Sequence, residues 1–552
     1  MRYIIIGAVA GGASTAARLR RLDEYAEILI FERGAYISYA NCGLPYYIGD
    51  VIKDRNKLFV QTAASFNQRF NIDVRVRTEV TSIDPNAKTI TATDLNTGIV
   101  YQERYDKLVL SPGAEPLRPL LPGINSAGIF TLRNVMDTDL IKTYANQHPQ
   151  GTAVVIGGGF IGLEMAENLH KLGMKVSVIE MGNQVLAPVD FPIAAIVQEH
   201  IRSKGVRLFL NTKVAGFELD ADGLKVMIEG ANSLQTDLVI LSIGVRPDTR
   251  LAVAAGLKIG EAKGIFVNEF LQTSNPDIYA VGDAIEFKNP ITQRTQISYL
   301  AGPANKQGRI CANNIVGGNI ESYKGAINTS IVQVFDLTIG ASGLAAKHLK
   351  SLDIPHVVST THHGSHASYY PDARPMTIQI SFSPSDGQLL GAQVIGYEGA
   401  DKRLDVLASI IKLNGSIHDL CEFEHAYAPP YSSAKDPVNM AGFVADNILQ
   451  DKLRVFYWNE LASISKEDLL IDVRTELEFQ SGAIENAINI PIDALRSRLS
   501  EIPIGKTIYI YCEAGLRGYF GQRILRQYGY KSVFNLSGGY KLWKVCTAQN
   551  AV

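Results

Sequence analysis

The chain carries the same folding unit twice, and this duplication limits its fold more than any other feature. Residues 1–32 and residues 151–180 each run through an apolar strand, a glycine-rich turn, a helical stretch and a second apolar strand that leads to an acid. A strand, a crossover helix and a second strand form a βαβ unit, and such alternation predicts parallel sheets covered by helices. We therefore expect an α/β protein with two doubly wound domains.

Length and charge set further limits. At about 150 residues per domain, a chain of 552 residues is expected to form three or four domains. The 53 basic and 55 acidic residues leave a net charge of -2, unlike the basic surface of a nucleic-acid-binding protein. No apolar run approaches the ~18 residues of a membrane-spanning helix. We expect neither a nucleic-acid nor a membrane partner, and a cytoplasmic location.

The second glycine turn has the full dinucleotide-binding pattern. Gly157, Gly159 and Gly162 follow an apolar strand and precede a helix, so the backbone can turn tightly and approach a pyrophosphate at the helix N-terminus. Glu180 follows the next strand, where a carboxylate accepts a hydrogen bond from a ribose 2′-hydroxyl. The two residues after it carry no cation for a 2′-phosphate. This favours NADH, with NADPH as the alternative because Lys175 lies nearby.

The first glycine turn is less regular. It reads Gly7-Ala8-Val9-Ala10-Gly11-Gly12, with valine in place of the second glycine of the pattern. The backbone would then approach a phosphate one or two residues later, at Gly11. A strand before the turn, a helix after it and Glu32 at the end of the next strand still predict a dinucleotide site.

Two of the five cysteines lie in settings that favour chemistry. Cys42 has no second cysteine close to it in the sequence, so its oxidised form would be a mixed disulfide, a persulfide or a sulfenic acid. A neighbouring helix N-terminus would lower its pKa. Cys512 follows an apolar strand and begins a short loop that would aim backbone N–H groups at the sulfur, with Arg517 adding a positive charge. The alternative for each is an inert, buried cysteine.

The remaining cysteines and a group of histidines carry no prediction of chemistry. Cys311, Cys421 and Cys546 lie in no such setting. His362, His363 and His366 have no carboxylate or thiol partner in sequence, so we interpret them as part of a polar loop and expect no metal site.

Several segments resemble a known family. The first glycine turn and residues 38–45, 302–309 and 427–436 resemble segments of the coenzyme A-disulfide reductases, which are pyridine nucleotide–disulfide oxidoreductases. Residues 273–284 resemble the flavoprotein segment whose aspartate, here Asp283, contacts the ribityl chain of FAD. The final part of the chain resembles a rhodanese domain in three segments, which are residues 470–474, 482–491 and 511–518.

The resemblance implies a domain order and a set of cofactor sites. FAD would bind to a Rossmann-like domain formed by residues 1–150 and 246–324, and NADH to a second one at residues 151–245. An α+β dimerisation domain would span residues 325–450 of a homodimer, and an α/β rhodanese domain residues 457–552. The implied cofactor-binding residues are Gly7, Ala10, Gly11, Gly12, Glu32, Arg33, Val80, Asp283, Tyr427, Gly157, Gly159, Gly162, Glu180 and Gly244.

The implied activity is an NAD(P)H-dependent reduction of coenzyme A disulfide, coenzyme A persulfide or polysulfide. Cys42 would attack the substrate sulfur, and Tyr427 of the partner subunit, with Tyr369 as a second hydroxyl, would donate a proton. Cys512 would carry a persulfide, and fusion to such a domain favours a persulfide or polysulfide substrate. The implied coenzyme A contacts are Ser14, Arg18, Arg21, Ser38, Asn41, Asn305 and Lys435. For the two arginines, the alternative is a solvated basic helix face. For Tyr369, Tyr370 and Tyr431 it is a core or interface position.

Two other functions stay open on this sequence. One is an NADH oxidase or peroxidase that uses a Cys42 sulfenic acid, although Ala10 stands where peroxidase relatives carry a histidine. The other is a redox-sensing scaffold that presents the C-terminal domain to a sulfur-accepting protein.

Overall fold

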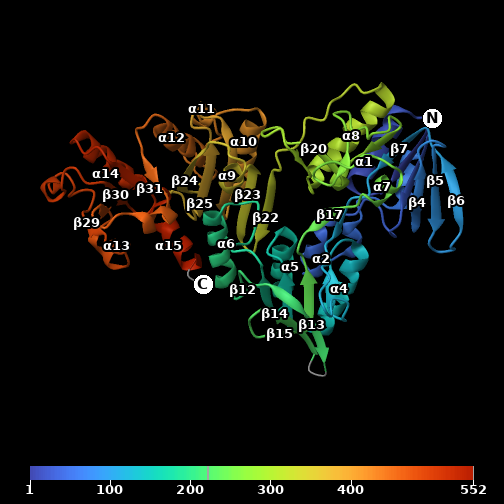
Figure 1. The fold of residues 1–552 in the computed structure, drawn as a ribbon, viewed down its shortest axis with the longest axis horizontal. Helices are drawn as coiled ribbons and strands as arrows, with labels where there is room; N and C mark the ends of the chain where they lie inside the picture. Colours follow the sequence, from blue (N-terminus) through green and yellow to red (C-terminus); the bar gives the residue numbers. More distant parts are fainter. Residues whose placement is uncertain (221–222, 551–552) are drawn as a thin grey trace. The chain divides into compact units, whose positions relative to one another are not determined.

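The computed structural model describes residues 1–220 and 223–550, and the chain forms two compact units. The first unit comprises residues 1–183 and 206–328, and the second comprises residues 184–205 and 329 onward. Both contain helices packed on β-sheets (Figure 1). The predicted α/β class is therefore confirmed.

The first glycine turn follows the carboxyl end of β1, which is the central strand of a five-stranded parallel sheet of order β19-β7-β1-β2-β3. The strand β1 pairs in parallel with β2 and β7, as a βαβ unit requires. Its unbroken apolar run is buried, as expected for the centre of a parallel sheet. Helices α1 and α8 pack side by side (Figure 1). The bounds are β1 Arg2–Ile6, α1 Ala10–Leu22, β2 Glu27–Glu32, β3 Asp73–Val76, β7 Lys107–Leu110, β19 Ile278–Ala280 and α8 Ala301–Gly317.

The second glycine turn lies in a sheet of the same kind. Its order is β12-β11-β10-β16-β9, and all its pairings are parallel. The two repeats predicted from the sequence therefore form two βαβ units, each in a five-stranded parallel sheet. The bounds are β9 Ile129–Thr131, β10 Thr152–Ile156, α5 Phe160–Lys171, β11 Lys175–Ile179, β12 Arg207–Phe209 and β16 Leu238–Leu241.

The first unit also contains small sheets, which are antiparallel except for the parallel pairing of β18 with β20. Residues 73–80, which the sequence presents as one strand-like stretch, divide between β3 and β4 because Arg77 adopts a φ of 49°. The strands are β4 Thr78–Asp84, β5 Thr89–Asp94, β6 Val100–Arg104, β8 Ala114–Pro116, β13 Val214–Asp220, β14 Gly223–Ile228, β15 Leu234–Thr236, β17 Val245–Pro247, β18 Ile265–Phe266, β20 Ile285–Lys288 and β21 Thr295–Gln296. The other helices of this unit are α2 Leu44–Ile48, α3 Ala63–Phe70, α4 Val135–Gln147 and α7 Arg250–Ala254.

The second unit begins with an antiparallel sheet of order β22-β23-β26-β25-β24. Helix α10 contacts β23 and β26, and α12 contacts β24 and β25. This arrangement is the α+β region that the sequence predicts. The bounds are β22 Ser330–Val334, β23 Leu337–Gly343, α9 Ala346–Ser351, β24 Val357–Gly364, β25 Pro375–Phe382, β26 Leu389–Gly396, α10 Ala400–Lys412, α11 Ile417–Glu422 and α12 Pro437–Leu449.

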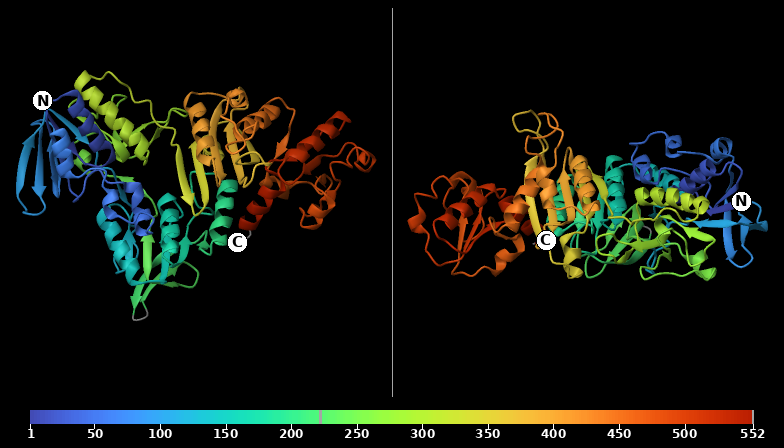
Figure 2. Two further views of the ribbon diagram at one scale, coloured as in Figure 1. Left: turned by 180° about the vertical axis from the view of Figure 1, so that it is seen from behind. Right: turned by 90° about the horizontal axis from the view of Figure 1, so that it is seen from above.

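The last part of the chain forms a parallel sheet of order β27-β31-β30-β28-β29. It appears in red with its helices in Figure 2. Its buried core is built mainly from isoleucine, leucine and valine on these strands and on α14. The bounds are β27 Val455–Phe456, β28 Leu469–Asp472, α13 Glu476–Gln480, β29 Ile488–Asn489, β30 Ile508–Tyr511, α14 Leu516–Gln527, β31 Val533–Leu536 and α15 Gly539–Asn550.

Helix α6 (Phe191–Ser203) belongs to the second unit, although it falls within residues 151–245. It packs against α15. Directly before it, the buried Asp190 accepts hydrogen bonds from the side chains of Gln379 (2.7 Å) and Gln393 (2.6 Å). This buried carboxylate joins the start of α6 to the antiparallel sheet.

The polar loop expected at His362 and His363 is wrong, because both residues lie in β24. The neighbouring strand β25 and the turn before α15 supply partners that a sequence pattern does not reveal. The His362 ring contacts Thr377 Oγ1 at 2.8 Å and the carbonyl oxygen of Gly538 at 3.0 Å. Within residues 1–220 and 223–550, no cluster of three potential metal ligands occurs, and no helix has the length and apolar character needed to cross a membrane.

Candidate active site

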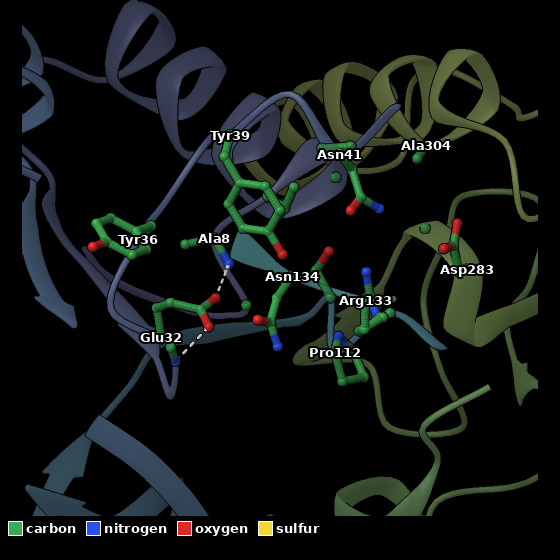
Figure 3. A pocket seen from close by; sticks show the side chains of 18 of the residues that line it. Ala8, Glu32, Tyr36, Tyr39, Asn41, Pro112, Arg133, Asn134, Asp283 and Ala304 are labelled. Carbon is green, nitrogen blue, oxygen red and sulfur yellow. Dashed lines mark hydrogen bonds between the residues drawn. The ribbon is translucent and has the colours of Figure 1, made fainter. Parts of the chain in front are cut away.

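A cavity of about 370 Å³ lies at the carboxyl ends of β1, β2 and β7. The loops after these strands form one wall, and the segments around Cys42, Arg133 and Asp283 complete the lining. Figure 3 shows Glu32 and Asp283 on opposite sides of the space, with Arg133 between them. Ligands of doubly wound sheets bind at this edge, so the cavity has the position of a dinucleotide site.

The glycines of the first turn keep the backbone accessible. Gly7 has a φ of +96°, and a Cβ at Gly12 would lie 1.8 Å from the carbonyl oxygen of Gly7. A Cβ at Gly11 would lie 2.9 Å from Ser111 Oγ. Helix α1 has neither a side-chain cap nor an acid in its first turn, so its N-terminal partial positive charge is available to a phosphate.

The Glu32 carboxylate is held in place by two backbone N–H groups. Its oxygens accept hydrogen bonds from Ala8 at 3.0 Å and Gly34 at 2.7 Å (Figure 3). Arg33 and the buried Val80 line an adjoining pocket together with Glu32. A carboxylate at the strand end and a glycine-containing turn at the helix start match a ribose and a pyrophosphate, so these residues fit the dinucleotide part of FAD.

Cys42 lies in the short helical turn Asn41–Gly43, next to α2, and its side chain is exposed on the cavity wall. The lowered thiol pKa expected from the sequence is wrong for this chain. Partial burial raises the pKa of the Cys42 thiol, and the negative charges of Glu164 and Asp283 raise it further. The thiol is accessible, yet its ionisation is opposed by two nearby carboxyl groups.

Glu164 is a site residue that sequence reasoning missed. It lies on α5, and its Oε1 accepts a hydrogen bond from the Tyr46 hydroxyl of α2 at 3.3 Å. Burial raises the pKa of Glu164 to about 7. The only signal in the sequence was its position two residues after Gly162, at the start of the helix that follows the second turn. Contact between α2 and α5 brings it to Cys42.

Arg133 was also missed, since no motif contains it. Its Nε donates to the carbonyl oxygen of Ala114 at 2.6 Å, and its guanidinium faces the cavity (Figure 3). Its positive charge partly offsets the effect of burial, which raises the pKa of Asp283. The Asn41 amide pairs with the same residue: its nitrogen donates to the Arg133 carbonyl oxygen at 3.1 Å, and its oxygen accepts from the guanidinium at 3.3 Å.

The second glycine turn repeats the geometry of the first. Gly157 has a φ of +105°, and a Cβ at Gly162 would lie 2.0 Å from the carbonyl oxygen of Gly157. The Glu180 carboxylate accepts hydrogen bonds from the backbone N–H groups of Gly158 and Gly182, both at 2.7 Å. Gly159 has open space where a Cβ would stand, and Gly244 adopts a φ of +116°. These residues fit a second dinucleotide.

The residues expected to contact coenzyme A fall into two groups. Ser14 and Asn305 meet where α1 and α8 pack, with 2.5 Å between Ser14 Oγ and Asn305 Oδ1. On α1, Arg18 donates to Asn313 at 2.9 Å. Arg21 is exposed on the same helix. The other residues of the first unit are Ser38 and Asn41, which lie in the segment leading to Cys42, while Lys435 belongs to the second unit.

Tyr369 and Tyr427 meet in the second unit. Their hydroxyl oxygens are 2.8 Å apart, although 58 residues separate them, and both rings are exposed. The buried Arg403 fixes the loops that carry them, because it donates to the carbonyl oxygen of Ser365 at 3.0 Å and to Asp436 at 2.8 Å. The hydrogen bond between Tyr369 and Tyr427 therefore forms within one chain and needs no partner subunit.

Cys512 follows β30 and begins the loop into α14. Its sulfur is 3.1 Å from the backbone nitrogen of Gly515, which adopts a φ of +106°. The backbone nitrogen of Tyr540 donates to the carbonyl oxygen of Cys512 at 2.8 Å and holds the loop against the start of α15. This loop directs a backbone N–H at the sulfur, as the sequence predicts.

Family models match three parts of the chain. The pyridine nucleotide-disulphide oxidoreductase model matches residues 1–308, more than half of the chain. The chain belongs to this family. The dimerisation-domain model of the same oxidoreductases matches residues 329–437, and the rhodanese-like domain model matches residues 458–546. These matches agree with the resemblance seen in the sequence.

Individual relatives of this oxidoreductase support the same assignment. The coenzyme A disulfide reductase of Staphylococcus aureus (strain JH9) is 34% identical over 445 residues, covering 80% of this chain and 99% of the relative. The crystal structure of reduced Bacillus anthracis CoADR-RHD matches with a TM-score of 0.97 and 48% identity, covering 99% of this chain and 98% of that one. A NAD-dependent persulfide reductase from A. fulgidus matches with a TM-score of 0.92 and 36% identity, covering 98% and 100%. The resemblance to coenzyme A-disulfide reductases with a C-terminal rhodanese domain, which the sequence predicts, is confirmed.

Proposed function

We propose that the protein is an FAD-dependent NAD(P)H reductase of coenzyme A persulfide or coenzyme A disulfide, with a C-terminal domain that carries sulfane sulfur. The observation that carries this proposal is a single accessible cysteine, Cys42, on the wall of a dinucleotide-shaped cavity. The other described cysteines are Cys311, Cys421, Cys512 and Cys546, and none of them lines this cavity. The named relatives, a disulfide reductase and a persulfide reductase, support the same substrate class.

Different residues of the chain bind the cofactors and carry out the sulfur chemistry. The Cys42 thiolate attacks the inner sulfur of the persulfide CoA–S–S–H, forms a Cys42–S–S–CoA disulfide and releases HS⁻. Bound against the first glycine turn and Glu32, FAD would supply the two electrons, taken from NADH, that return both sulfurs of this disulfide to the thiol level. Glu164, protonated in part near pH 7, lies beside Cys42 and supplies a proton at this site.

We infer that the active form is a homodimer. The match to a dimerisation-domain model supports it, and so do the exposed rings of Tyr369, Tyr427 and Tyr431, which are 73%, 47% and 70% accessible in the single chain. In the dimer, Tyr427 of the partner subunit would reach the Cys42 cavity and act as a proton donor, with Tyr369 holding its hydroxyl in place. Free thiols throughout the chain favour a reducing compartment such as the cytoplasm.

Replacing Glu180 tests the preference for NADH. We expect Glu180→Gln to lower kcat/KM for NADH by roughly tenfold or more, because a charge-assisted hydrogen bond to the ribose 2′-hydroxyl is lost. Activity with NADPH should rise, since repulsion of the 2′-phosphate is relieved. Steady-state kinetics with both nucleotides provide the measurement. Glu229→Gln, which removes a surface partner of Lys213 in the same domain, is the control and should change neither value.

Replacing Glu164 tests the electrostatic control of Cys42. The carboxylate raises the pKa of the thiol, so Glu164→Gln should move the Cys42 titration to lower pH and speed alkylation at pH 7 several-fold. The pH dependence of iodoacetamide labelling of the Cys42 peptide measures this. Asp54→Asn is the control, since Asp54 is exposed and is not among the charges acting on Cys42. A titration that stays in place in Glu164→Gln would contradict the assigned role.

Product analysis tests the proposed function as a whole. The purified holoenzyme, kept free of oxygen, should oxidise one NADH for each sulfide released from coenzyme A persulfide. With oxygen as the only acceptor, NADH oxidation should be slow. Rapid oxygen consumption without sulfide would instead support the oxidase alternative, and no turnover with any acceptor would support a scaffold.

A further inference from the structure

His362 has no role in the proposed function, although its ring links two parts of the second unit. It lies in β24, and its Nε2 is 3.0 Å from the carbonyl oxygen of Gly538, in the turn directly before α15. Its Nδ1 is 2.8 Å from Thr377 Oγ1, on the neighbouring strand β25. The imidazole therefore joins the antiparallel sheet to the C-terminal domain.

The partners of the His362 ring fix the position of its proton. A carbonyl oxygen only accepts hydrogen bonds, so Nε2 carries a proton and donates it to Gly538. Burial, and to a smaller extent the charge of Lys541, lower the pKa of His362 to about 4, so the imidazole is neutral near pH 7. A neutral imidazole has one N–H, so Nδ1 accepts from the Thr377 hydroxyl. Thr377 thus selects the tautomer that bonds Gly538.

The residues after Gly538 hold the loop that begins at Cys512. A Cβ at Gly539 would lie 2.6 Å from the carbonyl oxygen of Glu513 and 2.7 Å from that of Cys512. The backbone nitrogen of Tyr540 donates to the Cys512 carbonyl oxygen at 2.8 Å, and that of Lys541 to the Glu513 carbonyl oxygen at 3.0 Å. The start of α15 therefore fixes two successive peptide groups of the loop.

These two bonds determine how the loop surrounds the sulfur. In a trans peptide the C=O and the following N–H point in opposite directions. Because the Glu513 carbonyl faces α15, the N–H of Ala514 points away from α15. The next N–H, that of Gly515, has its nitrogen 3.1 Å from the Cys512 sulfur, and the Arg517 side chain interacts with the same sulfur by charge and by a hydrogen bond. The first turn of α15 thus supports the conformation in which the loop bonds the sulfur.

We propose that His362 is a positioning residue for sulfur transfer at Cys512. This inference rests on the proposed sulfurtransferase role of the C-terminal domain and adds to it a residue of the dimerisation domain. His362 holds Gly538 at the start of α15, and the amides of α15 keep the loop in the form that accepts sulfur. In that reaction, Cys512–S⁻ attacks the outer sulfur of a persulfide R–S–S–H, the S–S bond of the donor breaks, and Cys512–S–S–H and R–S⁻ result.

The test depends on the reach of the side chain at position 362. Glutamine places an amide nitrogen close to the position of Nε2 and can donate to Gly538, whereas asparagine is too short and phenylalanine has no donor. Loading of Cys512 is followed in the full-length holoenzyme by mass spectrometry of its peptide after addition of glutathione persulfide. His362→Asn and His362→Phe should each lower the loading rate by at least about tenfold, and His362→Gln should stay within about threefold of the unmodified protein.

Hydrogen exchange gives a second readout at the bonds themselves. The backbone N–H groups of Tyr540 and Lys541 should exchange at least about tenfold faster in His362→Asn and His362→Phe, and close to the unmodified rate in His362→Gln.

The matched control is Tyr457→Phe. The Tyr457 hydroxyl joins the C-terminal domain to the same strand, since it donates to the Val358 carbonyl oxygen at 3.0 Å and accepts from the Val358 backbone nitrogen at 3.3 Å. Its loss removes a contact with β24 but leaves the bond to Gly538, so the loading rate should stay within about threefold.

The outcomes separate this inference from the function on which it rests. Unchanged loading in both His362→Asn and His362→Phe would overturn the positioning role. An equal loss in His362→Gln would overturn it too, because packing and not the hydrogen bond would then matter. An equal loss in Tyr457→Phe would assign the effect to domain contact as a whole. Absence of loading in the unmodified protein would instead overturn the sulfurtransferase role.

Discussion

Cys42→Ser is expected to lower NADH-dependent sulfide release from coenzyme A persulfide by at least about 10³-fold, because a serine hydroxyl cannot form the disulfide through which the substrate is reduced. The side chain is exposed on the cavity wall, so the substitution removes one sulfur and leaves the packing of the first unit intact. Coupled measurement of NADH oxidation and sulfide provides the readout.

The matched control is Cys421→Ser. Cys421 is half-buried in α11 and does not line the cavity of this chain, so its replacement should leave turnover within about twofold of the unmodified enzyme. Flavin absorbance should be the same in both variants. Sulfide release that survives in Cys42→Ser would show that the disulfide forms elsewhere.

Gly12→Ala is expected to yield a protein with at least about tenfold less bound flavin. The added Cβ would lie 1.8 Å from the carbonyl oxygen of Gly7, which is backbone and has no rotamer to change. The turn and α1 would have to separate, and the phosphate cradle would open. The absorbance of purified protein at flavin wavelengths measures the occupancy.

Two further glycine variants separate loss of the site from loss of the fold. Gly302→Ala places a methyl group in open space at the start of α8, so flavin content should be unchanged. Gly162→Ala creates the same collision in the second turn, 2.0 Å from Gly157, so it should keep flavin and lose reaction with NADH. Full flavin occupancy in Gly12→Ala would contradict the assignment of the first turn.

The two glycine turns could be predicted because their requirements are local. A positive φ at Gly7 and Gly157, and a helix packed against the turn, depend on residues a few positions apart, so they leave a pattern in the sequence. The parallel sheets follow from the same local units. Cys42 could be identified for a similar reason, because the absence of a second cysteine close to it is a property of the local sequence.

The missed features depend on contacts between distant segments. Burial, and then the charge of Glu164 that the packing of α2 on α5 brings near, raise the pKa of the Cys42 thiol, where the sequence predicts a lowered one. Arg517 forms a two-bond ion pair with Glu478, 39 residues earlier, which no local pattern in the sequence indicates. The polar loop expected at His362 is a strand because β24 pairs with β25, and the His362 ring also contacts Gly538, 176 positions away.

The central claim is that Cys42 takes its oxidised partner from outside the chain. Denaturing mass spectrometry of the protein treated with coenzyme A disulfide tests this most directly. The account predicts a coenzyme A moiety on the peptide containing Cys42, removed by NADH. A Cys42 peptide that stays unmodified, or that is found linked to another cysteine of the chain, would contradict it.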